Sequence, residues 1–171
     1  MSESSADLSP VLHTQDARGV HTLTLNRANT FNALSEEMLG DLQAALDAVA
    51  IDDAARAVVI AAQGKVFCAG HNLKEMRARP DLAYYQPLFA PCPRLLLRLQ
   101  NLPVPVIARV QGLATAAGCQ LVAQCDLAVA ASHASLGVNG IDVGLFCATP
   151  SVPLSSRVVS LTAEPAPALA S

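Results

Sequence analysis

The sequence predicts one α/β domain in which buried strands alternate with amphipathic helices. The chain has 171 residues, of which 52% are hydrophobic and 15% charged, a composition that provides a sizeable core and excludes a disordered chain. Short apolar, β-branched runs alternate with segments of helical periodicity. The resulting order, β-α-β-α-β-α-β, is typical of an α/β architecture with a buried sheet.

The first half of this pattern is clear from residues 20 to 62. Residues 20–25 are β-branched and apolar and predict a strand, which a polar loop at 26–32 follows. Ser35 is a suitable N-cap, since two glutamates follow it and complement the helix dipole. Apolar residues then recur at helical spacing over 36–50, and the apolar run 57–62 predicts a buried strand.

The next stretch is predicted to be helical but interrupted by prolines. A helix is expected to begin at about residue 72 and to be interrupted at Pro80. A second helical segment is expected over 81–101, and Pro91 and Pro93 should break or kink it.

Two more strands and one helix complete the predicted core. Residues 104–110 and 126–130 are apolar and predict strands. A helix is expected between them, near 117–124.

Composition and charge exclude several classes of partner. The net charge is −3 and no basic stripe is present, so we expect no nucleic-acid partner. No apolar stretch approaches the roughly 18 residues of a membrane span, so no membrane partner is expected. The first residues resemble neither a secretory signal nor a transit peptide, which predicts a cytoplasmic protein.

The cysteines predict free thiols in a reducing compartment. Their number is odd, and no C-x-x-C pair is present, so neither a disulfide framework nor a structural metal site is expected. The five cysteines are Cys68, Cys92, Cys119, Cys125 and Cys147.

Two turns rich in small residues are the candidate functional elements. They lie in Phe67–Met76 and Gly112–Leu121, and each follows a β-rich run and leads into a predicted helix. Small residues let a ligand approach the backbone, and a helix start presents N–H groups at a positive dipole end. Two such turns can direct two N–H groups at one oxygen, as an oxyanion hole does. Taken singly, each turn would be a tight connection, and the second lacks the G-x-G-x-x-G pattern of nucleotide-binding folds.

Several spaced motifs resemble the crotonase (enoyl-CoA hydratase/isomerase) superfamily. They are Asn26-Arg27, Phe31–Leu34, Phe67–Met76, Val110–Gly112, Ala117–Leu121 and Cys125–Ala128. Within the superfamily, Gly70–Glu75, Ala117–Ala123 and Val143–Cys147 resemble the enoyl-CoA hydratase domain-containing protein 3 group.

The resemblance implies a fold and a ligand. The fold would be a superhelix of ββα repeats (the ClpP/crotonase fold), and the ligand an acyl-CoA thioester, with coenzyme A as part of the substrate and no separate cofactor. The backbone N–H groups of His71 and Ala117 fall at the two oxyanion-hole positions. Positions implied to bind the substrate are Phe31, Ala33, Ala69, Gly70, Asn72, Leu73 and Leu113.

Two departures from the family pattern put hydration in doubt. Hydratases of the family carry a glutamate where this chain has Gln120 and another where it has Gly140. Water addition to a conjugated double bond needs a base and an acid, each worth typically 10²–10⁴ in rate. A chain without both should be a poor hydratase even with an intact oxyanion hole.

Three other side chains are candidate substitutes for the missing glutamates, and Cys119 is a candidate nucleophile. Asp142 shares a face with Gly140 on an extended backbone but is also a candidate surface or capping residue. Glu75 is expected on an exposed helix face, and His71 is expected to contribute its N–H rather than its imidazole. Cys119 lies at a helix start, where a thiolate is stabilised, but a small buried hydrophobe is the simpler interpretation.

Three functions are therefore compatible with the sequence. The first is an impaired hydratase that stabilises an enolate through its oxyanion hole. The second is a non-catalytic protein that binds acyl-CoA or a family partner. The third is an enoyl-CoA isomerase, which needs one proton shuttle such as Asp142.

The pattern also predicts the organisation of the chain. Residues 1–11 form a flexible N-terminus, 12–154 the crotonase-like core, and 155–171 a divergent Pro/Ala-rich tail. Family members continue with further helices that close the site and pack in a trimer, so a truncated or frameshifted product without these C-terminal helices is expected, and a trimer is not. A short natural variant is the alternative.

Overall fold

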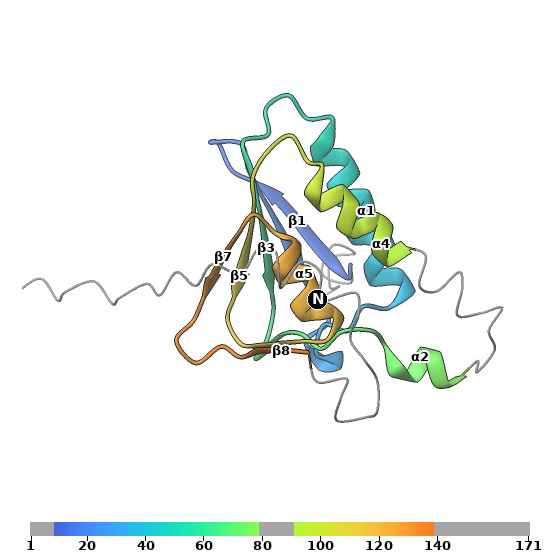
Figure 1. The fold of residues 1–171 in the computed structure, drawn as a ribbon. Helices are drawn as coiled ribbons and strands as arrows, with labels where there is room; N and C mark the ends of the chain where they lie inside the picture. The colour runs from blue at the N-terminus through green and yellow to red at the C-terminus, as the bar shows by residue number, and fades with distance from the viewer. Residues whose placement is uncertain (1–8, 79–90, 139–171) are drawn as a thin grey trace, which may run out of the picture.

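The computed structural model describes residues 9–78 and 91–138. Figure 1 shows a sheet with helices gathered on one side of it. The predictions for Gly140, Asp142, Cys147 and residues 81–90 fall outside the described residues.

The main sheet has five strands in the order β1-β2-β3-β5-β7. β1 pairs antiparallel with β2, and all the other neighbours are parallel. The strands are β1 (Val11–Gln15), β2 (Val20–Leu25), β3 (Ala57–Ala62), β5 (Val106–Val110) and β7 (Leu127–Ala130). Because parallel neighbours need long crossovers, helices connect them and cover the sheet.

The helices follow the predicted pattern closely. They are η2 (Ala28–Thr30, a 3₁₀ turn), α1 (Glu36–Ala50), α2 (Leu73–Ala78), α4 (Pro91–Gln100) and α5 (Ala117–Gln124). α1 begins as predicted, with the Ser35 hydroxyl accepting a hydrogen bond from the Met38 N–H. α1 and α4 lie side by side, and α5 packs against α4 (Figure 1).

The prolines of α4 lie in its first turn. α4 begins at Pro91, and Pro80 and residues 81–90 lie outside the described residues, so the break expected in the longer segment 81–101 stays a prediction. The N–H groups of the first helical turn have no intrahelical acceptor, so proline loses nothing there and its fixed φ suits the helix.

A second, smaller sheet was not predicted. Its three strands pair in parallel in the order β4-β6-β8. They are β4 (Val66–Cys68), β6 (Leu113–Thr115) and β8 (Leu136–Gly137), each too short to show a period of two. β4 and β6 overlap the first residues of the two small-residue segments and pair with each other, so this sheet brings the turns together.

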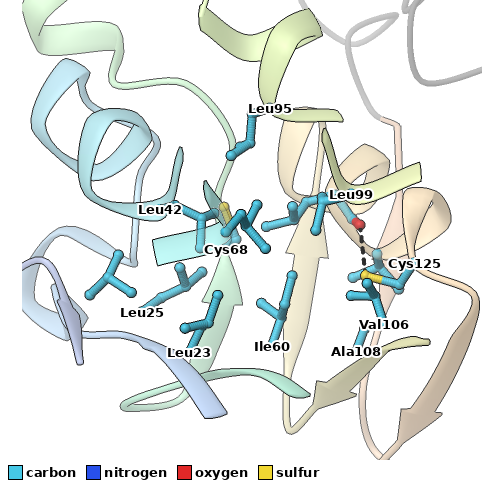
Figure 2. Close-up of a cluster of buried hydrophobic side chains, with 14 of the residues drawn as sticks. Leu23, Leu25, Leu42, Ile60, Cys68, Leu95, Leu99, Val106, Ala108 and Cys125 are labelled. Atoms are coloured by element: carbon cyan, nitrogen blue, oxygen red, sulfur yellow. Dashed lines mark hydrogen bonds between the residues drawn. The ribbon is translucent and has the colours of Figure 1, made fainter. Parts of the chain in front are cut away.

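The core lies between the main sheet and the helices. Figure 2 shows leucines of β2, α1 and α4 pointing toward one another across it. The labelled residues are Leu23, Leu25, Leu42, Ile60, Cys68, Leu95, Leu99, Val106, Ala108 and Cys125, all buried. Burial of each leucine contributes about 1.5–3 kcal/mol to the free energy of folding, so this cluster stabilises the sheet and helices that hold the turns.

Candidate active site

The first turn is held by a parallel backbone pairing. The Ala69 N–H donates to the Phe31 carbonyl at 3.1 Å, and the Leu34 N–H donates to the Gly70 carbonyl at 2.8 Å. The Asn72 N–H donates to the Leu34 carbonyl at 3.4 Å. This pairing brings together five of the predicted substrate-binding positions, namely Phe31, Ala33, Ala69, Gly70 and Asn72.

Asn32 anchors this pairing and was missed as a separate feature in the predicted polar loop. It is fully buried and has a left-handed backbone with φ of 51°. Its Oδ1 accepts from the Arg27 N–H at 2.8 Å, and its Nδ2 donates to the carbonyls of Gln63 at 2.9 Å and Val66 at 2.8 Å. The presence of an Asn in a tight polar loop could have indicated this anchor, because Asn tolerates the left-handed conformation and hydrogen-bonds to nearby backbone groups.

The second turn contains a strained alanine. Ala116 has φ of 50° and ψ of −124°, a combination that residues with a Cβ rarely adopt and that costs about 1–3 kcal/mol. Two hydrogen bonds hold it, from the Ala116 N–H to the Gly137 carbonyl at 3.0 Å and from the Gln120 N–H to the Ala116 carbonyl at 3.1 Å. The next residue, Ala117, begins α5, so its N–H precedes any intrahelical acceptor.

The two turns meet at their glycines. A Cβ on Gly70 would lie 3.2 Å from the Ala117 nitrogen and 3.1 Å from the Ala116 Cβ. A Cβ on Gly118 would lie 2.2 Å from the Cys68 carbonyl oxygen. His71 directly follows Gly70, so its N–H is one peptide unit from this contact. The structure therefore places Gly70, the residue before His71, against the start of α5 at Ala117.

Burial shifts the pKa values of three side chains around this contact toward the neutral form. Burial lowers the pKa of His71, although a hydrogen bond with the Leu34 backbone opposes the shift. Burial raises the pKa of Cys119, and it raises the pKa of Cys68 to about 12. Cys119 is 1% exposed and its thiol stays protonated, so the structure favours the buried hydrophobe over the nucleophile.

Gln120 lies on α5 three residues past Ala117 and is 7% exposed. Its amide can donate and accept hydrogen bonds but cannot take up a proton near neutral pH. Glu75 is half-buried rather than exposed, because its carboxylate accepts from Asn72 Nδ2 at 2.9 Å and from the Glu36 N–H at 3.4 Å. It therefore ties α2 to the start of α1.

The remaining predicted positions lie at the edges of the contact. Phe31 is 60% and Leu73 is 63% exposed, so both apolar side chains are open to a ligand beside the paired backbone. Leu113 begins β6, three residues before Ala116. A hollow of about 480 Å³ lies elsewhere, between α1 and α4, and is lined by Gln43, Asp47, Arg94, Leu97, Arg98 and Asn101.

Within residues 9–78 and 91–138, two kinds of feature are absent. No helix there is long and apolar enough to cross a membrane. No group of three or more His, Cys, Asp or Glu side chains there could hold a metal ion.

Known proteins resemble this chain in sequence and in structure. The enoyl-CoA hydratase domain-containing protein 3 of Xenopus laevis, a mitochondrial protein, is 45% identical over 157 residues, which cover 92% of this chain and 53% of the relative. The human protein of that name is 43% identical over 82% of this chain and 46% of its own length. The chain thus spans about half the length of the curated relatives it matches. The cytoplasmic location stays a prediction.

Solved structures agree with the sequence comparison. The crystal structure of an enoyl-CoA hydratase from Mycobacterium smegmatis superposes with a TM-score of 0.84 at 61% identity, covering 87% of this chain and 58% of that one. The human enoyl-CoA hydratase domain-containing protein 3 superposes with a TM-score of 0.81 at 41% identity, over 86% of this chain and 58% of that one. The crotonase fold is therefore confirmed.

The family model for enoyl-CoA hydratase/isomerase matches residues 15–162. This match covers both turns and the segment that pairs with the first of them. The chain belongs to the enoyl-CoA hydratase/isomerase family.

Proposed function

We propose that this chain binds an acyl-CoA thioester whose carbonyl oxygen accepts hydrogen bonds from the His71 and Ala117 N–H groups, and that it hydrates enoyl-CoA poorly. The contact between the two turns carries the proposal. A Cβ on Gly70 would lie in tight contact with the Ala117 nitrogen, at 3.2 Å, and Ala116 is held in a strained conformation at the same point. Backbone strain of this kind persists only where the surrounding structure enforces it, and it is concentrated at active sites and ligand-binding sites.

The site would act by electrostatic stabilisation. Two backbone donors and the positive end of α5 face the oxygen on which negative charge develops when the thioester forms an enolate. Because the donors belong to a rigid backbone, they need no reorganisation during the reaction. Loss of one such donor typically costs about 10²–10³ in rate. Coenzyme A enters as part of the substrate.

Hydration needs proton transfers that this chain is poorly equipped to make. Gln120 can orient a water molecule or the substrate but cannot accept its proton. Gly140, which lies outside the described residues, has no side chain. Since each missing acid or base removes a factor of about 10²–10⁴, we expect crotonyl-CoA hydration at least about 10⁴-fold below that of a two-glutamate hydratase.

Calorimetry beside a turnover assay tests the proposal. Butyryl-CoA, a saturated thioester, should bind the full chain, while crotonyl-CoA should be hydrated near the background rate. Gly70→Ala should weaken butyryl-CoA binding at least about tenfold, because the new methyl group and the φ of 87° both disturb the first turn. Gly40→Ala is the matched control, since nothing lies within 4 Å of the new methyl group on α1. Equal affinity of both variants for butyryl-CoA would contradict the proposed oxyanion site.

Gln120→Glu tests the missing base separately. The new carboxylate should raise hydration only in part, because the position of Gly140 still lacks its acid. Full hydratase activity in Gln120→Glu, or in the unchanged chain, would contradict the proposal for proton transfer while leaving thioester binding intact.

A non-catalytic binding protein is the second candidate, and the buried amide of Gln120 favours it. Exchange of the butyryl-CoA α-hydrogens in D₂O distinguishes the two, since exchange requires an enolate. Binding with exchange supports the impaired enzyme, whereas binding without exchange supports the non-catalytic protein.

A further inference from the structure

A hydrogen-bond network near the end of the β1–β2 hairpin is separate from the proposed acyl-CoA site. It connects His13, His21 and Asp52. Gln15 on β1 lies directly opposite His21 on β2, and His13 lies two residues before Gln15. His13 Nε2 is 2.8 Å from His21 Nδ1, and His21 Nε2 is 3.1 Å from Asp52 Oδ2. Asp52 lies in the connection between α1 and β3, so the hydrogen-bond network joins β1, β2 and this connection.

The partners of Asp52 fix the direction of these hydrogen bonds. Its Oδ1 accepts from the Ala54 N–H at 2.8 Å, and its Oδ2 also accepts from Gln15 Nε2 at 2.9 Å. The hydrogen bond from Ala54 is the main cause that holds the pKa of Asp52 below its usual value. The carboxylate is therefore ionised and accepts a hydrogen from His21 Nε2, which leaves His21 Nδ1 as the acceptor for His13 Nε2–H.

We propose that His13, His21 and Asp52 form a histidine clasp that fastens β1 to the rest of the fold and that opens in acid, because the pair cannot hold two added protons. One proton from solvent can add to His13 Nδ1, and His13 Nε2–H still donates to His21. A second proton must add to His21 Nδ1. Two N–H groups then face each other across 2.8 Å, and two positive rings lie with centroids 5.1 Å apart.

Burial makes this conflict effective. His21 is 3% exposed, so water cannot solvate a charge that develops on its ring. β1 is an edge strand that pairs only with β2 within the described sheet. The clasp therefore adds side-chain hydrogen bonds to a strand that has backbone hydrogen bonds on one side only. When the His13–His21 hydrogen bond breaks, we expect the end of β1 to separate from β2 first.

Other charged groups near the hairpin have partners of their own. On α1, Asp47 pairs with Arg98 and Asp41 accepts from the Ser9 hydroxyl. The guanidinium of Arg56, beyond the end of α1, donates to backbone carbonyls of the same connection. β3 has no charged residue. Asp52 is therefore the charged side chain that contacts the histidine pair within the described part of the chain.

The sign of the pH dependence follows from His13. Burial, and next the neighbouring His21, lower the pKa of His13 below its usual value of 6.5. A group with a depressed pKa in the folded state stabilises the fold above the unfolded pKa and loses this contribution as the pH falls. The clasp should therefore be closed at pH 7 and weaken progressively below about 6.5.

Hydrogen exchange of the β1 amides in the full chain tests the clasp. After correction for the intrinsic rate, opening should increase by up to about tenfold per pH unit as the pH falls below 6.5. His13→Gln keeps a donor for His21 Nδ1 but does not titrate, so this increase should be lost. His133→Gln, in an exposed loop, is the matched control and should behave as the unchanged chain. The same pH dependence in His13→Gln and the unchanged chain would overturn the proposal.

Nitrogen chemical shifts of the histidine rings give a check that needs no variant. The hydrogen-bond directions predict that His21 carries a hydrogen on Nε2, which donates to Asp52, and none on Nδ1, which accepts from His13. A hydrogen on His21 Nδ1 with β1 still protected would also overturn the proposal.

Discussion

Helix α1 and the contact between the two turns both contain glycine, but the glycines do different things. Nothing lies within 4 Å of a Cβ placed on Gly40 in α1, whereas a Cβ on Gly118 would collide with the backbone of Cys68. The helix forms because of its apolar stripe and its N-cap, so its glycine is incidental. In the turns, the small residues are what lets two backbone segments touch. At Gly118 the missing side chain therefore matters because of the backbone that it would meet, whereas at Gly40 it meets nothing.

The largest effect that sharpens this comparison is expected at Gly118. Gly118→Ala should destabilise the fold by about 2–4 kcal/mol, because the carbonyl of Cys68 must move out of the way. Gly40→Ala should instead stabilise it by up to about 1 kcal/mol, since alanine has the better helix propensity. Urea unfolding of the two variants measures the difference. Similar free energies of unfolding would mean that the turns are not in tight contact.

Asn32 should show the next largest effect. Asn32→Ala removes three hydrogen bonds and leaves the Arg27 N–H and two carbonyls without this partner, at a cost of about 2–3 kcal/mol. Asn29→Ala, in the exposed 3₁₀ turn, is the control and should change the free energy of unfolding by less than about 0.5 kcal/mol. Equal effects of the two substitutions would contradict the anchoring role.

Ala116 should give the smallest effect and the opposite sign. Glycine adopts the φ of 50° without strain, so Ala116→Gly should leave stability unchanged or raise it by up to about 1 kcal/mol. Thermal unfolding measures this change. A loss of more than about 1 kcal/mol would show that the conformation of Ala116 is not strained.

The parallel strands of the main sheet and the helices α1 and α5 could be predicted from the sequence, whereas the antiparallel edge strand β1 was not. The strand at 20–25 and the helix at 36–50 have the predicted bounds because apolar periodicity and the Ser35 cap are local signals. The strands β4, β6 and β8 were missed because two or three residues carry no period. α4 begins at Pro91, because proline suits the first turn of a helix, where its missing N–H costs no hydrogen bond.

The site was predicted as two turns, but not how they meet. Spacing alone could not show that Gly70 lies against Ala117 or that Ala116 is strained, since both depend on pairing between distant segments. Asn32 was named within a motif but not as an anchor, because two of its partners, Gln63 and Val66, are 31 and 34 residues away in the sequence. The predictions for Gln120 and Gly140 as replaced glutamates rest on the family pattern and stay predictions.

The vibrational frequency of a bound thioester tests the central claim most directly. Butyryl-CoA labelled with ¹³C at its carbonyl should show a stretch at lower frequency when bound than in water, because two N–H donors polarise the C=O bond. The shift should be present in the unchanged chain and in Gly40→Ala, and reduced or lost in Gly70→Ala. A bound carbonyl with the same frequency as in water would contradict the claim that the two turns form an oxyanion hole.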